Sequence, residues 1–435
     1  MKGFTVVWVG QIVSLLGTAM SNFALTLWAY EITGKATPLA LVGFFFVTPM
    51  VILGPFVGAL VDRGNRKMMM MLSDLAAAVT MLFVLILFLT DSLQIWHLYV
   101  AATITGIFQG FQWPAYSAAI SLMLPKDQYA RANGLLELAG NASTVVAPLF
   151  AGVLIAPLGV GGILSIDLAT AVFAIATLLL VEIPQPEKST VGQEGEGNFF
   201  QEAAYGFRYI FARPSLLGLQ FVFLMGNFFN ALAFSVFAPM ILGRTGNNEL
   251  IFGSVQSAGA IGGVIGGLAM SAWGGFKRRI DGVMLGWIFV GLFGQVLTGL
   301  GQSLPVWVVG IFIVTFCAPI LNASNQAIWQ AKVPPDVQGR VFSTRRLIAW
   351  FASPLSRLLA GPLADNVMEP AMSDGGTLAP VFGWLVGTGT GAGIALMFVF
   401  TGVLLGLTGV VGYLIPVIRR VEELLPDHDA SIPSA

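Results

Sequence analysis

The sequence predicts an all-α polytopic membrane protein with twelve transmembrane helices arranged as two six-helix halves. Of its 435 residues, 56% are hydrophobic and 10% are charged, whereas a soluble domain carries about 25% charged residues. The apolar runs are long enough to cross a bilayer, which takes about 20 residues each. A short motif also recurs at a fixed distance along the chain, which indicates two related halves.

Twelve apolar runs of sufficient length follow one another along the chain. Several contain Gly and Pro, which membrane helices tolerate better than soluble helices do. The first run is too long for a signal peptide and ends in no small-residue cleavage site, so we expect a retained helix. The predicted spans are residues 5–30, 38–61, 68–90, 97–124, 128–156, 160–183, 214–243, 250–273, 281–300, 304–331, 340–364 and 391–418.

A polar gap separates the first six runs from the last six. We therefore predict an N-terminal six-helix half over residues 1–183, a cytoplasmic linker over 184–213, a C-terminal half over 214–420 and a cytoplasmic tail over 421–435. The end of the linker alternates aromatic and charged residues from position 199 onward. That pattern predicts an amphipathic helix lying at the membrane interface.

The basic residues predict the orientation. With the N-terminus in the cytoplasm, eighteen of the 21 Lys and Arg residues fall on the cytoplasmic side. Cytoplasmic loops carry an excess of these residues, so we expect both termini in the cytoplasm. The net charge of −1 gives no basic field for nucleic acid, which is not an expected partner. The single cysteine, Cys317, excludes an intrachain disulfide.

An internal repeat appears at an offset of 209 residues. Pro125, Asp127 and Arg131 follow the fourth span, and the same three residue types follow the tenth span as Pro334, Asp336 and Arg340. The same offset carries Gly58 onto Gly267. Two homologous six-helix halves related by an axis along the membrane normal are typical of secondary transporters.

The loop between the second and third spans carries the most specific local pattern. Gly58 allows close helix approach, Asp62 places a carboxylate at the helix end, and Arg63, Arg66 and Lys67 favour the cytoplasmic side. This G-x-x-x-D-R-x-x-R-K pattern resembles the signature loop of the major facilitator superfamily. The resemblance implies that family's twelve-helix transporter fold, and we interpret the five residues as a gating loop.

Several shorter segments narrow the resemblance to one branch. Residues 8–14, 30–34, 113–116, 125–134 and 338–343 resemble macrolide-efflux and siderophore-exporter-like members. The resemblance implies export of a small amphiphilic molecule across a bacterial plasma membrane. The expected partners are that substrate, protons and the lipid bilayer, with a monomer as the working unit. No nucleotide-binding motif or cofactor is predicted, so an ion gradient or the substrate's own gradient would supply the energy.

Three departures from the family pattern limit what can be carried over. Residues 147–152 have alanines where the fifth-span antiporter motif has glycines. The arginine that many proton-coupled drug antiporters carry in span four is missing from residues 103–110. Ser271 stands where the second copy of the signature loop would have its acid. Only the first copy of the loop is therefore complete.

In this fold, spans one, four, seven and ten line a central cavity. Polar residues of spans four and ten recur at spacings i, i+3, i+4 and i+7, which places them on one helix face. Interhelical hydrogen bonding is the alternative role of such residues. Neutral amides and aromatic rings favour an amphiphile over a small anion. The predicted cavity residues are Gln11, Asn22, Gln109, Gln112, Trp113, Tyr116, Asn227, Asn230, Asn322, Asn325, Gln326 and Trp329.

Charged residues inside spans are the candidates for ion coupling, because burying a charge in a membrane is costly. We predict Glu137, Asp167 and Arg357 as possible coupling residues. We also predict that Asp62 docks at the N-terminus of span eleven, near Arg340, when the cytoplasmic side is closed. That N-terminus offers free backbone N–H groups and the positive end of a helix dipole.

Three alternatives to export remain open from the sequence. One is a lysophospholipid-type flippase, which would need a basic headgroup site. Another is an uptake transporter, and a third is a non-transporting membrane receptor or assembly factor. An enzyme is not predicted, because no catalytic or metal-ligating set of residues is present in the sequence.

Overall fold

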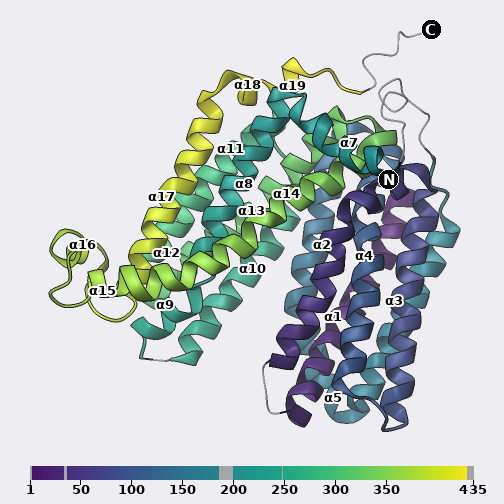
Figure 1. The fold of residues 1–435 in the computed structure, drawn as a ribbon, viewed down its shortest axis with the longest axis horizontal. Helices are drawn as coiled ribbons and strands as arrows, with labels where there is room; N and C mark the ends of the chain where they lie inside the picture. Colours follow the sequence, from purple (N-terminus) through teal and green to yellow (C-terminus); the bar gives the residue numbers. More distant parts are fainter. Residues whose placement is uncertain (1, 34–36, 186–198, 247, 429–435) are drawn as a thin grey trace.

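The computed structural model describes residues 2–33, 37–185, 199–246 and 248–428. Within these ranges the regular elements are helices, and no strand occurs. Figure 1 shows two groups of long helices, α1 to α5 and α8 to α17, which converge at one end and diverge toward the other. We call the converging end, where α7, α18 and α19 lie, the closed end.

The described part of the N-terminal half contains five α-helices, which provide six spans, and the short 3-10 helix η1 (Lys126–Gln128). The fifth α-helix is 52 residues long, but Gly159 interrupts it with a φ of +65°, a left-handed conformation that suits glycine. The chain turns there, so this helix contains both span five and span six. The α-helices are α1 (Lys2–Thr33), α2 (Thr37–Arg63), α3 (Arg66–Leu89), α4 (Ile95–Met123) and α5 (Tyr129–Leu180).

The C-terminal half repeats this plan with more interruptions. Span seven is α8 (Pro214–Phe234) with α9 (Phe237–Arg244), and span nine is α11 (Arg279–Ile288) with the π-helical segment η2 (Phe289–Gln295) and α12 (Val296–Leu300). The remaining elements are α10 (Glu249–Trp273), α13 (Leu304–Lys332), α14 (Gln338–Leu363), η4 (Ala364–Met368), α15 (Glu369–Met372), α16 (Ala379–Val386), α17 (Ala392–Leu414), α18 (Pro416–Arg419) and α19 (Val421–Leu424).

Among the described residues, eight helical stretches are long and apolar enough to cross a membrane, or nine if the bent α2 is included. One of the eight, Lys126–Leu180, covers both spans of α5. The other two predicted spans are α4 and α14, which carry glutamines and arginines respectively. Polar residues in a membrane helix face protein or water, so these two helices are expected near the centre of the molecule.

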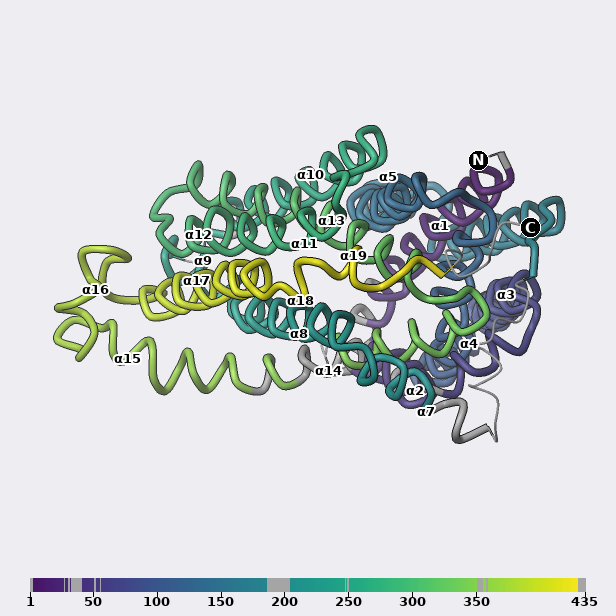
Figure 2. The backbone as a smooth tube through the Cα atoms, turned by 90° about the horizontal axis from the view of Figure 1, so that it is seen from above, coloured from purple at the N-terminus to yellow at the C-terminus, as the bar shows by residue number. Residues whose placement is uncertain are grey.

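Helix α7 (Phe199–Phe211) lies within the stretch expected to form an interfacial helix. Its placement at a membrane surface stays a prediction, and residues 186–198 of the linker lie outside the described residues. Viewed from the closed end, the halves meet along two lines, where α14 lies beside α2 and where α5 lies beside α10 and α13 (Figure 2).

The 209-residue offset is visible in the contacts between the halves. Gln326 on α13 donates a hydrogen bond to the hydroxyl of Ser117 on α4, at 2.9 Å, and the two positions are separated by 209 residues. Equivalent positions in a two-fold pseudo-symmetric molecule contact each other near the axis. The bond therefore places the pseudo-axis between α4 and α13.

Candidate functional site

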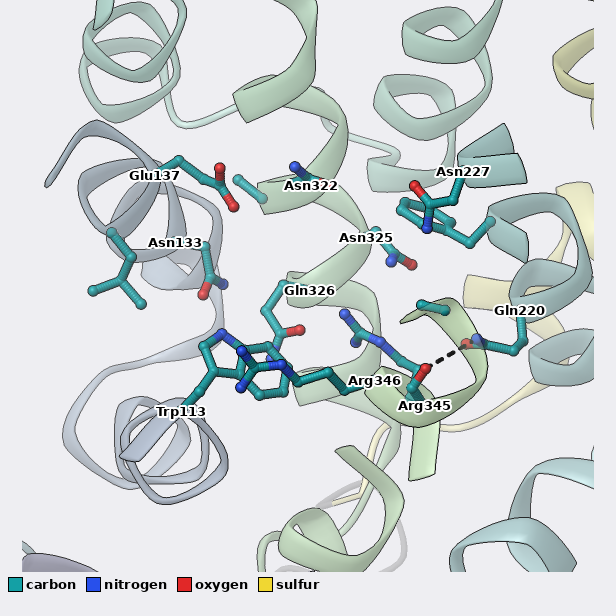
Figure 3. A pocket seen from close by; sticks show the side chains of 14 residues that line it. Trp113, Asn133, Glu137, Gln220, Asn227, Asn322, Asn325, Gln326, Arg345 and Arg346 are labelled. Carbon is teal, nitrogen blue, oxygen red and sulfur yellow. Dashed lines mark hydrogen bonds between the residues drawn. The ribbon is translucent and has the colours of Figure 1, made fainter. Parts of the chain in front are cut away.

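A cavity of about 330 Å³ lies between the two halves (Figure 3). Helices α4 and α5 provide one wall, and α8, α13 and α14 provide the other. Cavities of a few hundred cubic ångströms, with apolar surface and a few convergent polar groups, are typical small-molecule sites. The lining residues are Trp113, Asn133, Leu136, Glu137, Gln220, Phe223, Asn227, Asn322, Ala323, Asn325, Gln326, Arg345, Arg346 and Ala349.

The wall formed by α13 presents a row of amides. Asn322, Asn325 and Gln326 all line the cavity, as their helical spacing predicts. Trp329, one turn below, is fully buried and donates a hydrogen bond from Nε1 to Oδ1 of Asn325, at 3.1 Å. This bond fixes the orientation of the Asn325 amide, so Trp329 supports the wall from behind.

Two arginines from the second and third turns of α14 also line the cavity. The Arg345 guanidinium lies 5.3 Å from the ring centre of Trp329 and 5.9 Å from that of Trp113. The Arg346 guanidinium lies 5.2 Å from the ring centre of Trp113. All three distances lie in the range of cation–π interactions. Figure 3 shows the two side chains entering the cavity from the same helix.

The cavity is therefore charged, whereas the row of amides had led us to expect a neutral one. Arg345 and Arg346 were not among the predicted cavity residues. Both lie within the predicted span 340–364, and an arginine inside a span is a functional candidate on its own. That signal was present in the sequence, but it did not show which way the side chains point.

The possible coupling residues occupy different surroundings. Glu137 on α5 lines the cavity, and its carboxylate points toward Asn322 (Figure 3). Asp167 is buried inside the N-terminal half, where it accepts a hydrogen bond from Thr18 at 3.0 Å. The side chain of Arg357 on α14 lies outside the described residues. Of the three, Glu137 has direct contact with the cavity.

The structure brings five of the twelve predicted cavity residues to its wall: Trp113, Asn227, Asn322, Asn325 and Gln326. The remaining seven lie elsewhere. Tyr116 and Trp329 are buried in hydrophobic clusters, and Asn22 is exposed on α1. Gln109 and Asn230 are partly exposed outside the lining of this cavity. Helical spacing predicts a shared face but not the depth at which each residue meets the partner half.

Gln11 and Gln112 are instead part of a hydrogen-bond network inside the N-terminal half. Gln112 donates to Oε1 of Gln11 at 2.7 Å, and both amides donate to the carboxylate of Asp74, at 2.8 and 3.1 Å. Asp74 is almost fully buried. For these two residues the interhelical role applies, because a buried carboxylate needs hydrogen-bond donors.

The gating loop closes one line of contact between the halves. Asp62 accepts hydrogen bonds from the backbone N–H groups of Gly339 at 2.6 Å and Arg340 at 2.8 Å, and from Nε of Arg340 at 3.1 Å. The expected contact with the N-terminus of span eleven is present. Gly58 permits it, because a Cβ there would lie 2.5 Å from the carbonyl oxygen of Gly339.

The basic residues of the same loop make separate contacts. Arg66 is fully buried and donates to the carbonyl oxygens of Ala118, at 3.0 Å, and Pro335. Lys67 donates to the carbonyl oxygen of Leu179 at 3.0 Å, and Arg63 is exposed. The gating role of the loop stays a prediction.

Further hydrogen bonds between the halves lie near the closed end. Ser121 donates to Gln338 at 2.8 Å, and Asn133 donates to Gln330 at 2.7 Å. Together with Asp62 they seal the molecule on the side that the charge pattern predicts to be cytoplasmic. The cavity is therefore separated from that side by a layer of paired polar groups.

The tail adds a carboxylate between the two halves. Asp427 pairs with Lys126, which precedes α5, at 3.0 Å and with Lys332, at the end of α13, at 2.9 Å. Burial alone would raise the pKa of the Asp427 carboxyl, but the hydrogen bonds and charges of the two lysines together lower it. In the described part of the chain, no group of three or more His, Cys, Asp or Glu side chains is placed to hold a metal ion.

Comparison with known proteins agrees with this architecture. The family profile described as Major Facilitator Superfamily matches residues 7–356. The chain is 27% identical over 373 residues to macrolide efflux protein A of Streptococcus pyogenes, covering 84% of this chain and 90% of that protein. It is 23% identical over 288 residues to the enterobactin exporter EntS of Salmonella typhimurium, covering 65% and 67% of the two chains.

A solved structure shares the fold. The human organic anion transporter MFSD10 superposes with a TM-score of 0.65 over 92% of this chain and 98% of that chain, at 17% sequence identity. At this identity the likeness shows the fold alone. The predicted resemblance to the macrolide-efflux and siderophore-exporter branch is confirmed by the two sequence relatives.

Proposed function

The chain belongs to the major facilitator superfamily and is a multi-pass membrane transporter rather than an enzyme, and we propose that it exports small amphiphilic organic molecules by alternating access. In this proposal protons enter as the substrate leaves. The protein works as a monomer in a bacterial plasma membrane, with both termini in the cytoplasm. Its relatives of the efflux type support the direction of transport.

The observation that carries the proposal is the cavity between the two halves. It combines apolar and aromatic surface from Trp113, Leu136 and Phe223 with amide groups. Loose specificity for amphiphiles suits such a lining, because aromatic surface and dispersed hydrogen-bonding groups accept many shapes. The polar layer at the closed end blocks one exit, as alternating access requires of each end in turn.

Glu137 is the proposed proton carrier. It lies in the cavity wall, where a bound substrate and a proton compete for its carboxylate. Residues 103–110 contain no arginine, so coupling does not run through an arginine of span four. Asp167 accepts a hydrogen bond from Thr18 away from the cavity. Glu137 is therefore the stronger candidate for the proton carrier.

Transport into inside-out membrane vesicles tests the proposal. With an acidic lumen, wild-type vesicles should accumulate a fluorescent amphiphile, and collapsing the pH gradient should release it. Glu137→Gln should abolish the dependence on the gradient, whereas Glu423→Gln, at an exposed acid of the tail, should not. Accumulation that ignores the pH gradient in wild type would exclude proton antiport, and absence of accumulation for every amphiphile would exclude export.

A further inference from the structure

The charges in the cavity wall do not balance. Among its described lining residues, Arg345 and Arg346 are cationic and Glu137 is the acid. Glu137 points toward Asn322, on the side of the cavity away from the two arginines (Figure 3). The wall therefore carries one more positive than negative charge, and the acid does not neutralise Arg345.

Arg345 has no counter-charge in the described part of the chain. Its Nη1 atom is buried and makes no hydrogen bond there, and no carboxylate among those residues pairs with it. The hydrogen bond from Gln220, at 3.2 Å, goes to its backbone carbonyl oxygen and not to its guanidinium. The residue as a whole is partly exposed, but a buried donor of a charged group without an acceptor is unfavourable.

Aromatic rings surround the guanidinium instead. Those of Trp329, Trp113 and Phe342 lie 5.3, 5.9 and 5.8 Å away, measured to the ring centres. Cation–π contacts compensate part of the lost hydration, but they leave the buried Nη1 donor without an acceptor. A group that enters the cavity can supply the missing acceptor, because Arg345 lines it.

From this geometry we propose that the cavity binds an organic anion, an amphiphile with one carboxylate beside an apolar body, and that Arg345 holds the carboxylate. This inference rests on the proposed function and narrows its substrate class. A guanidinium offers paired N–H donors that match a carboxylate, and it keeps its charge when buried. Trp113, Leu136 and Phe223 provide contact for the apolar body.

A matched series of fluorescent ligands tests the inference on the purified full-length protein. Dansylglycine is an anion, dansylglycinamide is its neutral counterpart, and dansylcadaverine is a cation. Energy transfer from tryptophan reports binding, because Trp113 lines the site. We expect the anion to bind at least ~10-fold more tightly than the amide, the ratio that a charge-assisted hydrogen-bond pair provides.

Variants assign the preference to Arg345. Arg345→Gln should remove the difference between anion and amide, and Arg345→Lys should keep part of it, because a lysine retains the charge but not the paired donors. The control Arg420→Gln, at an arginine whose side chain is 56% exposed, should bind like wild type. An anion preference that is absent from wild type, or that survives Arg345→Gln, overturns the inference.

Thermal unfolding of the ligand-free protein provides an independent readout. Because a partly buried cation without a counter-charge is unfavourable, Arg345→Gln should unfold at the same or a higher temperature than wild type. A markedly lower unfolding temperature would show that Arg345 serves the fold and would overturn its role as a ligand residue. If Arg345→Gln does not fold at all, the same conclusion follows, and Arg345→Lys then shows whether charge alone restores folding.

Competition identifies the source of the anionic group. Ibuprofen, a carboxylic acid, should displace dansylglycine from wild-type protein. Displacement by 1-oleoyl-lysophosphatidylglycerol alone would assign the site to a lipid phosphate and overturn the organic-acid assignment. The vesicle assay remains separate: loss of all amphiphile accumulation would refute the proposed export, whereas the order of dansyl affinities decides the ligand class of the cavity.

Discussion

The two lines along which the halves meet are related by the internal repeat, yet they are closed differently. At the first, between α2 and α14, Asp62 binds two backbone N–H groups and the side chain of Arg340. At the second, between α10 and α5, the equivalent position is Ser271, whose hydroxyl donates to Gly267 in its own helix at 2.6 Å. The first has an ionic contact across the halves, and the second has packing.

Close packing is common to both lines. A Cβ at Gly58 would lie 2.5 Å from the Gly339 carbonyl oxygen, and a Cβ at Gly267 would lie 2.9 Å from the Cα of Leu138. The carboxylate that the second line lacks within its helices comes from the tail, where Asp427 pairs with Lys126 and Lys332. Both lines are therefore closely packed, and among the described residues the ionic contact between Asp62 and Arg340 distinguishes the first from the second.

The largest effect is expected from Asp62→Asn. The Asp62 side chain is 2% exposed and pairs with the buried Arg340, and removing one partner of a buried pair costs ~3 kcal/mol or more. The closed end should therefore open, which lowers the outward-facing population by ~100-fold. Maleimide labelling of Asn322→Cys from the outer side, in a Cys317→Ser background, measures that population. Unchanged labelling and transport would refute a gating role for Asp62.

Gly58→Ala and Gly267→Ala should have the next largest effects, and similar ones. Each new methyl group meets backbone atoms of the opposite half, and overpacking of this kind costs ~1–3 kcal/mol. Vesicle transport should fall by ~10-fold in both variants. Gly140→Ala is the matched control, because no atom lies within 4 Å of its added Cβ. Wild-type transport by Gly267→Ala would show that the contact between α10 and α5 tolerates looser packing.

Ser271→Asp should make the second line resemble the first. Ser271 lies against the first turns of α5, since a Cβ on Gly134 would lie 3.1 Å from its hydroxyl oxygen. A carboxylate near that helix N-terminus stabilises the closed end by ~1 kcal/mol, which favours the outward-facing state by ~5-fold. Labelling of the Asn322→Cys reporter should rise and turnover should fall. A fall in labelling would mean that the new carboxylate weakens the contact between α10 and α5.

The smallest effect is expected from Asp427→Asn. Its ion pairs are partly exposed, and such pairs contribute about 1 kcal/mol or less. Because the lysines lower the pKa of Asp427 below its ordinary value of 3.8, its contribution is fully present above that value and is lost as the pH falls through the lowered pKa. The difference in unfolding temperature between wild type and variant should thus be constant between pH 6 and 8. A difference that changes within that interval would contradict the assignment.

The sequence by itself determined the class of protein, the helical spans and the family. Runs of about 20 apolar residues predict spans wherever they occur, and the pattern from Gly58 to Lys67 identifies the superfamily. It also predicted the partner of Asp62, because a carboxylate at one helix end and a basic helix N-terminus in the other half attract each other whatever the details of packing.

The tertiary structure alone decided which polar residues share the cavity. Helical spacing predicted the row Asn322, Asn325 and Gln326, but the same reasoning placed Gln11 and Gln112 there, and Asp74 holds both inside the N-terminal half. The spacing of residues in one helix fixes a face, whereas the tilt and depth of the neighbouring helix decide what that face meets. For the same reason the direction of Arg345, and with it the charge of the cavity, follows from the packing of α14 against α2 and α8.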